Sequence, residues 1–190
     1  MHGARLRQTL RLYTILTSTG RTRYLKEKKI FGAIGDNCNI MSRTVPLYAK
    51  LIKLGNNVRI ASNVTFVTHD VTHVMLNANQ TLKGERFKER IGCIEIKDNV
   101  FVGSGSTILY GVRIGSNVIV GAGSLVNRDV PSNSVIGGVP ARVISSFEDY
   151  LEKRRTEETY PDELGPGEET IDAETAQWCW REFYKKHGES

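Results

Sequence analysis

The sequence predicts an all-β core built as a parallel β-helix of hexapeptide repeats, with helical extensions at both ends. The first observation is a strict period of six, in which every sixth residue is aliphatic: Ile96, Val102, Ile108, Ile114, Val120 and Val126. The second is an asparagine or glycine three places after each of the first five: Asn99, Gly105, Gly111, Asn117 and Gly123. Both types tolerate a positive φ, which indicates a corner between short strands. A period of six fits neither an α-helix nor a simple strand.

The third observation is a longer period, which sets the number of hexads per coil. The segment VGSGS at 102–106 returns as VGAGS at 120–124, eighteen residues later. Three hexads per coil make a triangular prism in which parallel strands of successive coils stack about 4.8 Å apart. We therefore expect Ile96 beside Ile114, and Val100 beside Val118.

Residues 1–30 are predicted to form a helical cap on the first coil. Apolar residues recur at helical spacing among arginines, at Leu6, Leu10, Tyr13 and Leu16. The run breaks at Ser18-Thr19-Gly20, so Ser18 or Thr19 is expected to cap a second helix that ends near Lys29. Such a cap covers the unpaired strand edges that an open β-helix end exposes.

The β-helix is predicted to occupy residues 31–145, with two interruptions. It begins at Ile34 and slips in register between Ile40 and Leu54, where Pro46 indicates a small outward bulge. The hexads stop again after Phe66, and residues 72–93 are expected to form an inserted, non-repeating loop. Long excursions from a rigid scaffold tend to carry binding functions, so we expect this loop to select the substrate.

Residues 146–190 are predicted to contain two helices joined by an acidic linker. A short helix is expected from Ser146 to Arg155, and residues 157–169 are acidic and rich in proline and glycine. Asp172 or Thr170 is expected to cap the last helix. That helix carries Trp178, Trp180, Phe183 and Tyr184.

Composition and charge narrow the class of protein. A hydrophobic content of 39% and a charged content of 25% are ordinary for a soluble protein, and no apolar run is long enough to insert into a membrane. Three cysteines at no metal spacing (Cys38, Cys93 and Cys179) favour a cytoplasmic location. Residues 1–29 hold eight Lys/Arg and one acid, and residues 147–190 hold six Lys/Arg and thirteen acids. No aromatic and basic stripe accompanies this asymmetry, so nucleic acid is not expected as a partner.

His69 is the candidate catalytic residue. It lies at the root of the predicted loop, at the end of an interrupted hexad, where a loop can cover it. Histidine exchanges a proton near neutral pH and so suits a general base. Asp70 is expected to face away from it, because neighbouring strand residues point to opposite faces. A zinc hydratase site on such a prism needs three histidines, and only His69 and His73 are available, so no metal is expected.

Two stretches carry a resemblance to a known family. NVTFVTHD at 63–70, together with the run from IKDNVF at 96 to GGVPARVI at 144, resembles the sugar O-acetyltransferase branch of the hexapeptide-repeat acyltransferases. That branch includes galactoside, maltose, nodulation-factor and polysaccharide-modifying acetyltransferases. The resemblance covers residues 25–145 and implies a left-handed β-helix, a homotrimer with sites between subunits, and a role in polysaccharide biosynthesis. It also implies that His69 takes a proton from an acceptor hydroxyl, which attacks acetyl-CoA directly without an acyl-enzyme.

The same resemblance implies the residues that meet acetyl-CoA. Ser104 and Ala122 fall where the backbone meets the pantetheine arm, and glycine corners allow such close approach. Arg128 stands where the family usually has lysine, and Arg142 matches a position that meets the nucleotide phosphates, which arginine favours. His73 and Asn63 are candidate substrate-binding residues, although Asn63 is equally interpreted as a corner residue.

The acceptor stays open at this point. Transfer to a hydroxyl of a sugar or glycan is expected, and N-acetylation of an amino sugar is nearly as compatible. A non-catalytic assembly protein on the same repeat is the third alternative. It would not need His69, the inserted loop or the arginines near the end of the β-helix.

Overall fold

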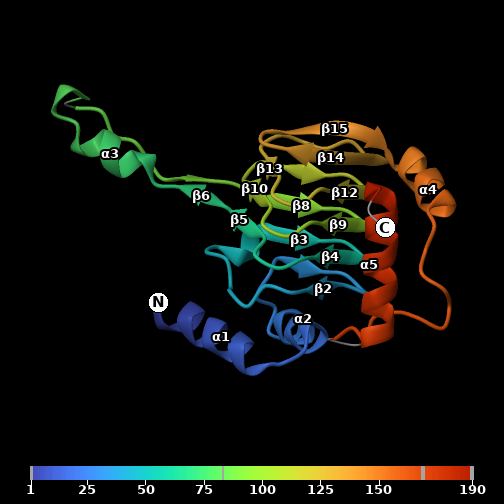
Figure 1. Cartoon of the computed structure of the whole chain (residues 1–190). Coiled ribbons are helices and arrows are strands. Elements are labelled where there is room, and N and C mark those ends of the chain that lie inside the picture. Colours follow the sequence, from blue (N-terminus) through green and yellow to red (C-terminus); the bar gives the residue numbers. More distant parts are fainter. Residues whose placement is uncertain (1, 83, 168–169, 189–190) are drawn as a thin grey trace. The chain divides into compact units, whose positions relative to one another are not determined.

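The computed structural model describes residues 2–82, 84–167 and 170–188, in two compact units: residues 1–150 and residues 151–190. Unit 1 contains three parallel sheets that form the sides of a prism (Figure 1). One sheet has the order β1-β3-β8-β11 and another has the order β13-β10-β5. The third has the order β15-β14-β12-β9-β4-β2, in which only the β14–β15 pair is antiparallel.

The strands are short, as hexads require. The first sheet comprises β1 (Ala33–Ile34), β3 (Ile52–Leu54), β8 (Ile94–Ile96) and β11 (Arg113–Ile114). The second comprises β5 (Thr65–Val67), β10 (Thr107–Leu109) and β13 (Leu125–Val126). The third comprises β2 (Asn39–Ile40), β4 (Val58–Ile60), β9 (Val100–Val102), β12 (Val118–Val120), β14 (Ser134–Gly138) and β15 (Ala141–Ser146).

The register confirms three hexads per coil. Ile96 pairs with Ile114 and Val100 pairs with Val118, each eighteen residues on, as expected. Ile108 pairs with Val126 at the same offset in the second sheet. The eighteen-residue echo in the sequence is therefore the distance from one coil to the next.

The predicted corner residues have the predicted backbone. All five, from Asn99 to Gly123, have a φ between 56° and 79°. Along one edge the corner asparagines also join side chain to side chain, Nδ2 to Oδ1, at 2.8–3.1 Å. This asparagine ladder runs through Asn37, Asn57, Asn99, Asn117 and Asn133, all at positive φ. Each asparagine thus pairs its side-chain amide with that of its neighbour. Each also adopts a positive φ, which is unfavourable for most other residue types.

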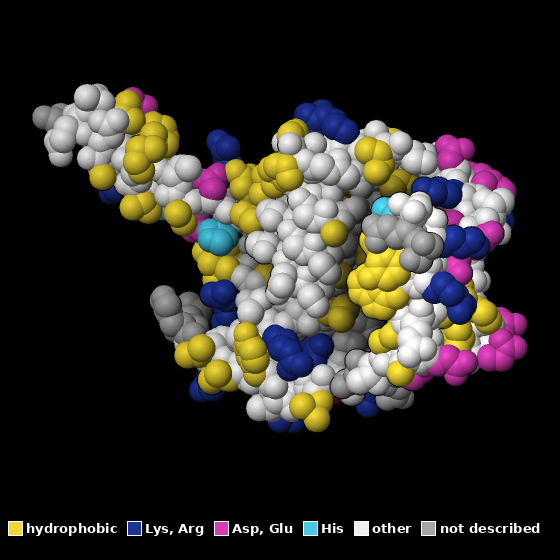
Figure 2. Space-filling view, viewed as in Figure 1, with side chains coloured by type: hydrophobic (Ala, Val, Ile, Leu, Met, Phe, Trp, Pro, Cys, Tyr) yellow, Lys and Arg dark blue, Asp and Glu magenta, His cyan; other side chains and the backbone are white. Residues whose placement is uncertain are grey.

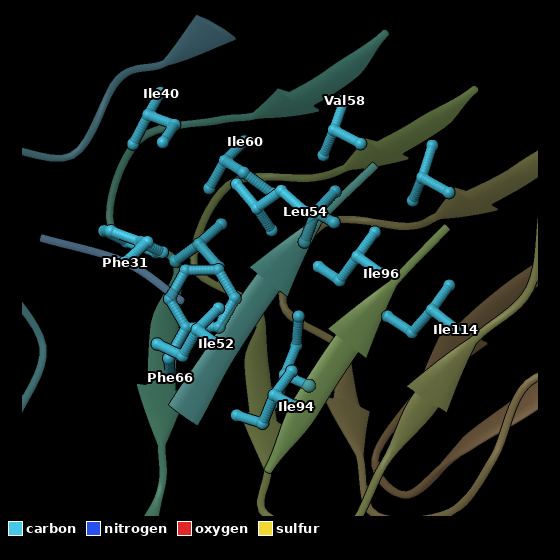
Figure 3. Close-up of a cluster of buried hydrophobic side chains, with 14 of the residues drawn as sticks. Phe31, Ile40, Ile52, Leu54, Val58, Ile60, Phe66, Ile94, Ile96 and Ile114 are labelled. Atoms are coloured by element: carbon cyan, nitrogen blue, oxygen red, sulfur yellow. The ribbon is translucent and has the colours of Figure 1, made fainter. Parts of the chain in front are cut away.

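The aliphatic positions of the hexads fill the prism interior. Figure 3 shows Ile52, Leu54, Ile94, Ile96 and Ile114 of the first sheet pointing toward residues of the other sides. These side chains are at most 3% exposed, and burial of each is worth about 1.5–3 kcal/mol. Near the start of the β-helix, the rings of Phe31 and Phe66 pack edge to face with centroids 6.3 Å apart.

Two helices precede the first coil, and the second of them packs on β2. They are α1 (His2–Thr14) and α2 (Ser18–Glu27). Leu12 and Leu25 join the core, and the hydroxyl of Thr22 accepts a hydrogen bond from the backbone N–H of Ile40 at 2.8 Å. The predicted cap was wrong: Thr17 caps α2 by accepting from the N–H of Gly20, and Ser18, Thr19 and Gly20 lie inside the helix.

Both interruptions of the repeat leave the prism. Residues 41–51 form the bulge predicted around Pro46 and end in a 3₁₀ helix, η1 (Ala49–Leu51). The later insertion begins earlier than predicted and is not a plain loop. Strands β6 (His69–Asp70) and β7 (Arg90–Ile91) pair antiparallel at its root, and α3 (Thr72–Ala78) and η2 (Gln80–Leu82) follow β6. We call residues 69–91 the arm; Figure 1 shows it extending away from the prism.

The C-terminal part contains a hairpin and two helices among the described residues. Strands β14 and β15 form a hairpin with a cis Val139–Pro140 bond, and α4 (Phe147–Thr156) follows. In unit 2, Asp172 caps α5 (Ala173–His187) by accepting from the N–H of Thr175 at 2.8 Å. Acidic side chains gather over α4 and the segment after it (Figure 2). Over the described residues, no helix is both long and apolar enough to cross a membrane.

Candidate active site

His69 lies where the arm leaves the prism. It follows β5 and pairs with Ile91 across the arm's root, which fixes its backbone. Its side chain lines a cavity of about 300 Å³, whose walls include Arg5, Phe66 and the bulge from Ser42 to Leu47. The ring is partly buried, and its Nδ1 is buried without a hydrogen-bond partner among the described residues. A buried polar atom left unpaired is costly, and such atoms mark sites that a ligand completes.

Tyr48 is the aromatic neighbour of His69. Their ring centroids lie 5.2 Å apart at 71°, an edge-to-face contact. The Tyr48 hydroxyl donates to the Glu89 carboxylate, with oxygen distances of 3.1 and 3.2 Å, and this bond raises the pKa of Tyr48. Tyr48 itself has a φ of 51°, so the bulge holds it in a strained backbone conformation. The bulge and the returning side of the arm thus meet beside the candidate base.

The root of the arm is fixed to the prism through Asp70. Its carboxylate accepts from the hydroxyl of Thr72 at 2.6 Å and from the hydroxyl of Tyr110, on the neighbouring coil, at 2.5 Å. These hydrogen bonds lower the pKa of Asp70 to about 2, and the bond from Thr72 has a larger effect than the bond from Tyr110. Tyr110 also lies near Arg90, the cross-strand partner of Asp70, and its hydroxyl raises the pKa of that arginine. None of the bonds of Asp70 goes to His69, as the strand alternation predicts.

His73 lies on α3, beyond the root of the arm. It is partly buried, and its Nδ1 has no hydrogen-bond partner within the described chain. The arm is closed on itself farther out, where the Asn77 side chain donates to the Phe87 carbonyl and accepts from the Phe87 N–H, both at 2.9 Å. His73 is therefore carried by an ordered segment, and it does not line the His69 cavity.

Asn63, Ser104 and Ala122 fall in one column of corners. The N–H of Gly105 donates to Ser62 O, and the N–H of Gly123 donates to Ser104 O, which stacks the three corners. Asn63 has a φ of 59°, so it occupies a corner, which agrees with its interpretation as a corner residue. Ser104 and Ala122 are exposed, and their backbone N–H groups make no hydrogen bond to the described residues.

Gly103 allows the corner at Ser104 to lie close to the corner at Ala122 on the next coil. A Cβ on Gly103 would lie 2.5 Å from the backbone nitrogen of Ala122, so no larger residue fits. The column therefore presents backbone amides at the surface with little side-chain cover. An extended ligand that carries its own amide carbonyls fits such a surface.

Arg128 and Arg142 lie at the same cleft, near the C-terminal end of the β-helix. Both line one cleft of about 250 Å³ between the turn after β13 and the β14–β15 hairpin. Their charges favour an anionic group there. This cleft and the His69 cavity have no lining residue in common within the described chain.

The sequence did not point to Tyr48, Glu89 or Tyr110. Tyr110 stands at an ordinary position of a hexad, ILYGVR, and Tyr48 and Glu89 lie in the two stretches where the repeat fails. The failure of the period is the only sequence signal for Tyr48 and Glu89, and no sequence signal marks Tyr110. Among the described residues, no group of three or more His, Cys, Asp and Glu side chains is placed to hold a metal ion.

Comparisons with known proteins show which families this chain resembles. A family model described as bacterial transferase hexapeptide (six repeats) matches residues 94–128. Protein CapG of Staphylococcus aureus is 39% identical over 149 residues, which cover 77% of this chain and 84% of that protein. The galactoside O-acetyltransferase of Lactococcus lactis is 34% identical over 143 residues, covering 64% of this chain and 66% of that one.

A solved structure shares the fold. A galactoside acetyltransferase in complex with coenzyme A superposes with a TM-score of 0.54 at 27% identity, covering 83% of this chain and 86% of that one. The chain spans only 66%, 55% and 45% of three of the curated relatives that it matches.

Proposed function

The chain belongs to the bacterial transferase hexapeptide family, and from this premise we propose that it is an acetyl-CoA-dependent acetyltransferase acting on a hydroxyl of a sugar or glycan. The observation that carries the proposal is His69, a partly buried histidine beside a cavity, with an unpartnered nitrogen, where the arm leaves a rigid prism. Relatives named galactoside O-acetyltransferase support both the acetyl group and the sugar hydroxyl.

In this proposal His69 is the general base. Its imidazole accepts the proton of the acceptor hydroxyl as the oxygen of that hydroxyl bonds to the acetyl carbonyl carbon, and no residue of the chain is acylated. The carbon–sulfur bond of the thioester would then break, and His69 would return the proton to the leaving thiolate, which is released as free thiol. Tyr48 packs against the ring and limits its rotation. The Asp70–Tyr110 hydrogen bond keeps the backbone of His69 in place by holding the arm's root on the prism. Asp70 and Tyr110 are thus positioning residues, because they act through the backbone.

The chain's surfaces fit acetyl-CoA, which when bound would supply an activated thioester. The exposed corners at Ser104 and Ala122 offer unpaired amides to its pantetheine arm, and Arg128 and Arg142 offer charge to its phosphates. His73 and Asn63 are proposed to contact the acceptor from the arm and from the corner column.

We further propose a left-handed β-helix and a homotrimer with the sites between subunits. Separation of the His69 cavity from the arginine cleft within one chain supports the second point. A neighbouring copy would bring the corner column of one subunit to the His69 of another. A cytoplasmic place in polysaccharide biosynthesis accords with such a reaction.

Two measurements test the proposal. Calorimetry with acetyl-CoA should detect binding at a single class of sites, and a screen of sugars, amino sugars and nucleotide sugars should release free thiol with at least one acceptor. Mass spectrometry of the product distinguishes an O-acetyl ester from an N-acetyl amide. Absence of acetyl-CoA binding would favour the alternative, a non-catalytic assembly protein.

A further inference from the structure

The cavity at His69 has a larger neighbour. A cavity of about 790 Å³ lies between α1, the end of α2, the bulge and the returning side of the arm. The two cavities share a wall made of Arg5, Val45, Pro46 and Leu47. Because Arg5 lines both cavities, an acceptor whose hydroxyl reaches His69 through the smaller cavity would have the Arg5 side chain beside it.

The larger cavity is strongly basic. Four of its lining side chains are cationic (Arg5, Lys28, Lys29 and Lys50), and Glu89 is the one acidic residue among those described along it. Figure 2 shows Lys and Arg side chains over the part of unit 1 that carries α1 and α2. Glu89 already accepts a hydrogen bond from Tyr48, which lines the same cavity, so one hydroxyl donor partly satisfies its carboxylate.

Arg5 is held at the junction of the two cavities. Its Nε donates to the carbonyl of Val45 at 2.9 Å, which orients the guanidinium from the bulge. No described residue accepts a hydrogen bond from its two Nη groups, so their donors are available to a ligand. A guanidinium fixed by one bond and open at the fork presents paired donors that match a carboxylate or a phosphate.

We propose that the acceptor is an anionic sugar or glycan, and that Arg5, with the lysines of the larger cavity, binds its carboxylate or phosphate while a hydroxyl faces His69. The position of the hydroxyl at His69 rests on the proposed function. The binding of an anionic group at Arg5 does not depend on it. Arg5 is a specificity residue, because it distinguishes charged from neutral acceptors.

The test compares matched sugars on the full-length protein. Galactose, galacturonic acid and galactose 6-phosphate are used as probes, both in calorimetric binding without acetyl-CoA and in acetyl transfer. Wild-type protein is expected to prefer at least one anionic probe over galactose by about 10-fold or more, because charge-assisted hydrogen bonds are strong. The stronger of the two anionic probes identifies carboxylate or phosphate as the recognised group.

Arg5→Gln should reduce that preference by roughly 10- to 100-fold. Arg7→Gln removes a charge from the same helix at an exposed position that lines neither cavity, and it should leave the preference unchanged. If Arg5→Gln fails to fold, Lys28→Gln, at an exposed position on the larger cavity, should lower the preference in the same direction.

The outcomes separate the two claims. Equal binding of galactose and both anionic probes, or equal loss in the Arg5 and Arg7 variants, would overturn the anionic-acceptor inference and leave the transferase proposal standing. Anion binding that depends on Arg5, without any binding of acetyl-CoA, would support the inference and overturn the proposed reaction.

Discussion

The hydroxyl of Tyr110 donates a hydrogen bond to Oδ2 of Asp70 across 2.5 Å and thereby joins one coil of the prism to the root of the arm. Tyr110 belongs to the regular repeat, and Asp70 belongs to its interruption. The contact therefore holds Asp70, the residue next to His69, in a fixed position on the β-helix. It also makes the position of the candidate base sensitive to a change on another coil.

Tyr110→Phe should loosen the arm without harming the prism. The ring stays, and only the hydroxyl that donates to Asp70 is lost. Hydrogen exchange at β6 and β7 should become faster while exchange at β9 and β12 stays slow, and turnover should fall several-fold with acetyl-CoA affinity unchanged. Asp70→Asn keeps an accepting oxygen and should behave between the wild type and Tyr110→Phe. Unchanged exchange at the arm's root would contradict this account.

The arm's root should resist acid down to about pH 4. The pKa of Asp70 is lowered from 3.8 to about 2, so the stabilisation by its ionised form is fully present above the unfolded value and is lost as pH falls toward 2. The stability difference between wild type and Asp70→Asn should thus be constant from pH 7 to about 5 and shrink below about pH 4. Urea unfolding at several pH values measures it, and a difference that changes between pH 5 and 7 would show that another group is responsible.

The asparagine ladder should contribute to stability mainly through its backbone conformation. Asn99→Ala places an ordinary side chain at a φ of 57° and removes two ladder bonds, which should cost about 1–3 kcal/mol. Asn99→Gly removes the same bonds but accepts the positive φ, so it should cost less. Denaturant midpoints of the two variants provide the comparison, and equal losses would mean that the hydrogen bonds dominate.

Arg128 and Arg142 should act together on the cofactor. Because they line one cleft, replacing either with alanine should raise the KM for acetyl-CoA, and the double variant should lose less than the sum of the two single changes in free energy. Arg23→Ala, at an exposed position on α2, is the matched control. Full additivity, or an effect of the control, would indicate general electrostatics instead of a shared site.

The regular part of this protein could be predicted from its sequence, because a period of six leaves few alternatives. The pairing of Val100 with Val118 and the positive φ at Gly111 both follow from spacing alone. The prediction of the α2 capping residue was wrong because Thr17, Ser18 and Thr19 are chemically similar neighbours. The backbone conformation alone decides which of them caps the helix.

The surroundings of His69 could not be predicted in the same way. His69 was found because the hexads stop beside it, but nothing in the sequence relates Tyr48 or Arg5 to it. Both come from segments without a repeat, and their contacts depend on how the bulge and α1 fold over the first coil. The candidate functional residues lie in the interruptions of the repeat. An interruption has no strand register, so contacts between its side chains cannot be derived from residue spacing.

The central claim is that His69 removes the acceptor proton, and His69→Ala tests it most directly. Turnover with the best acceptor should fall by about 10²–10⁴, the usual contribution of a general base, while the acetyl-CoA Kd from calorimetry stays within about two-fold. His187→Ala, on α5 in unit 2, serves as the control and should retain full turnover. Wild-type turnover in His69→Ala would contradict the account, because another group would then have to take the proton.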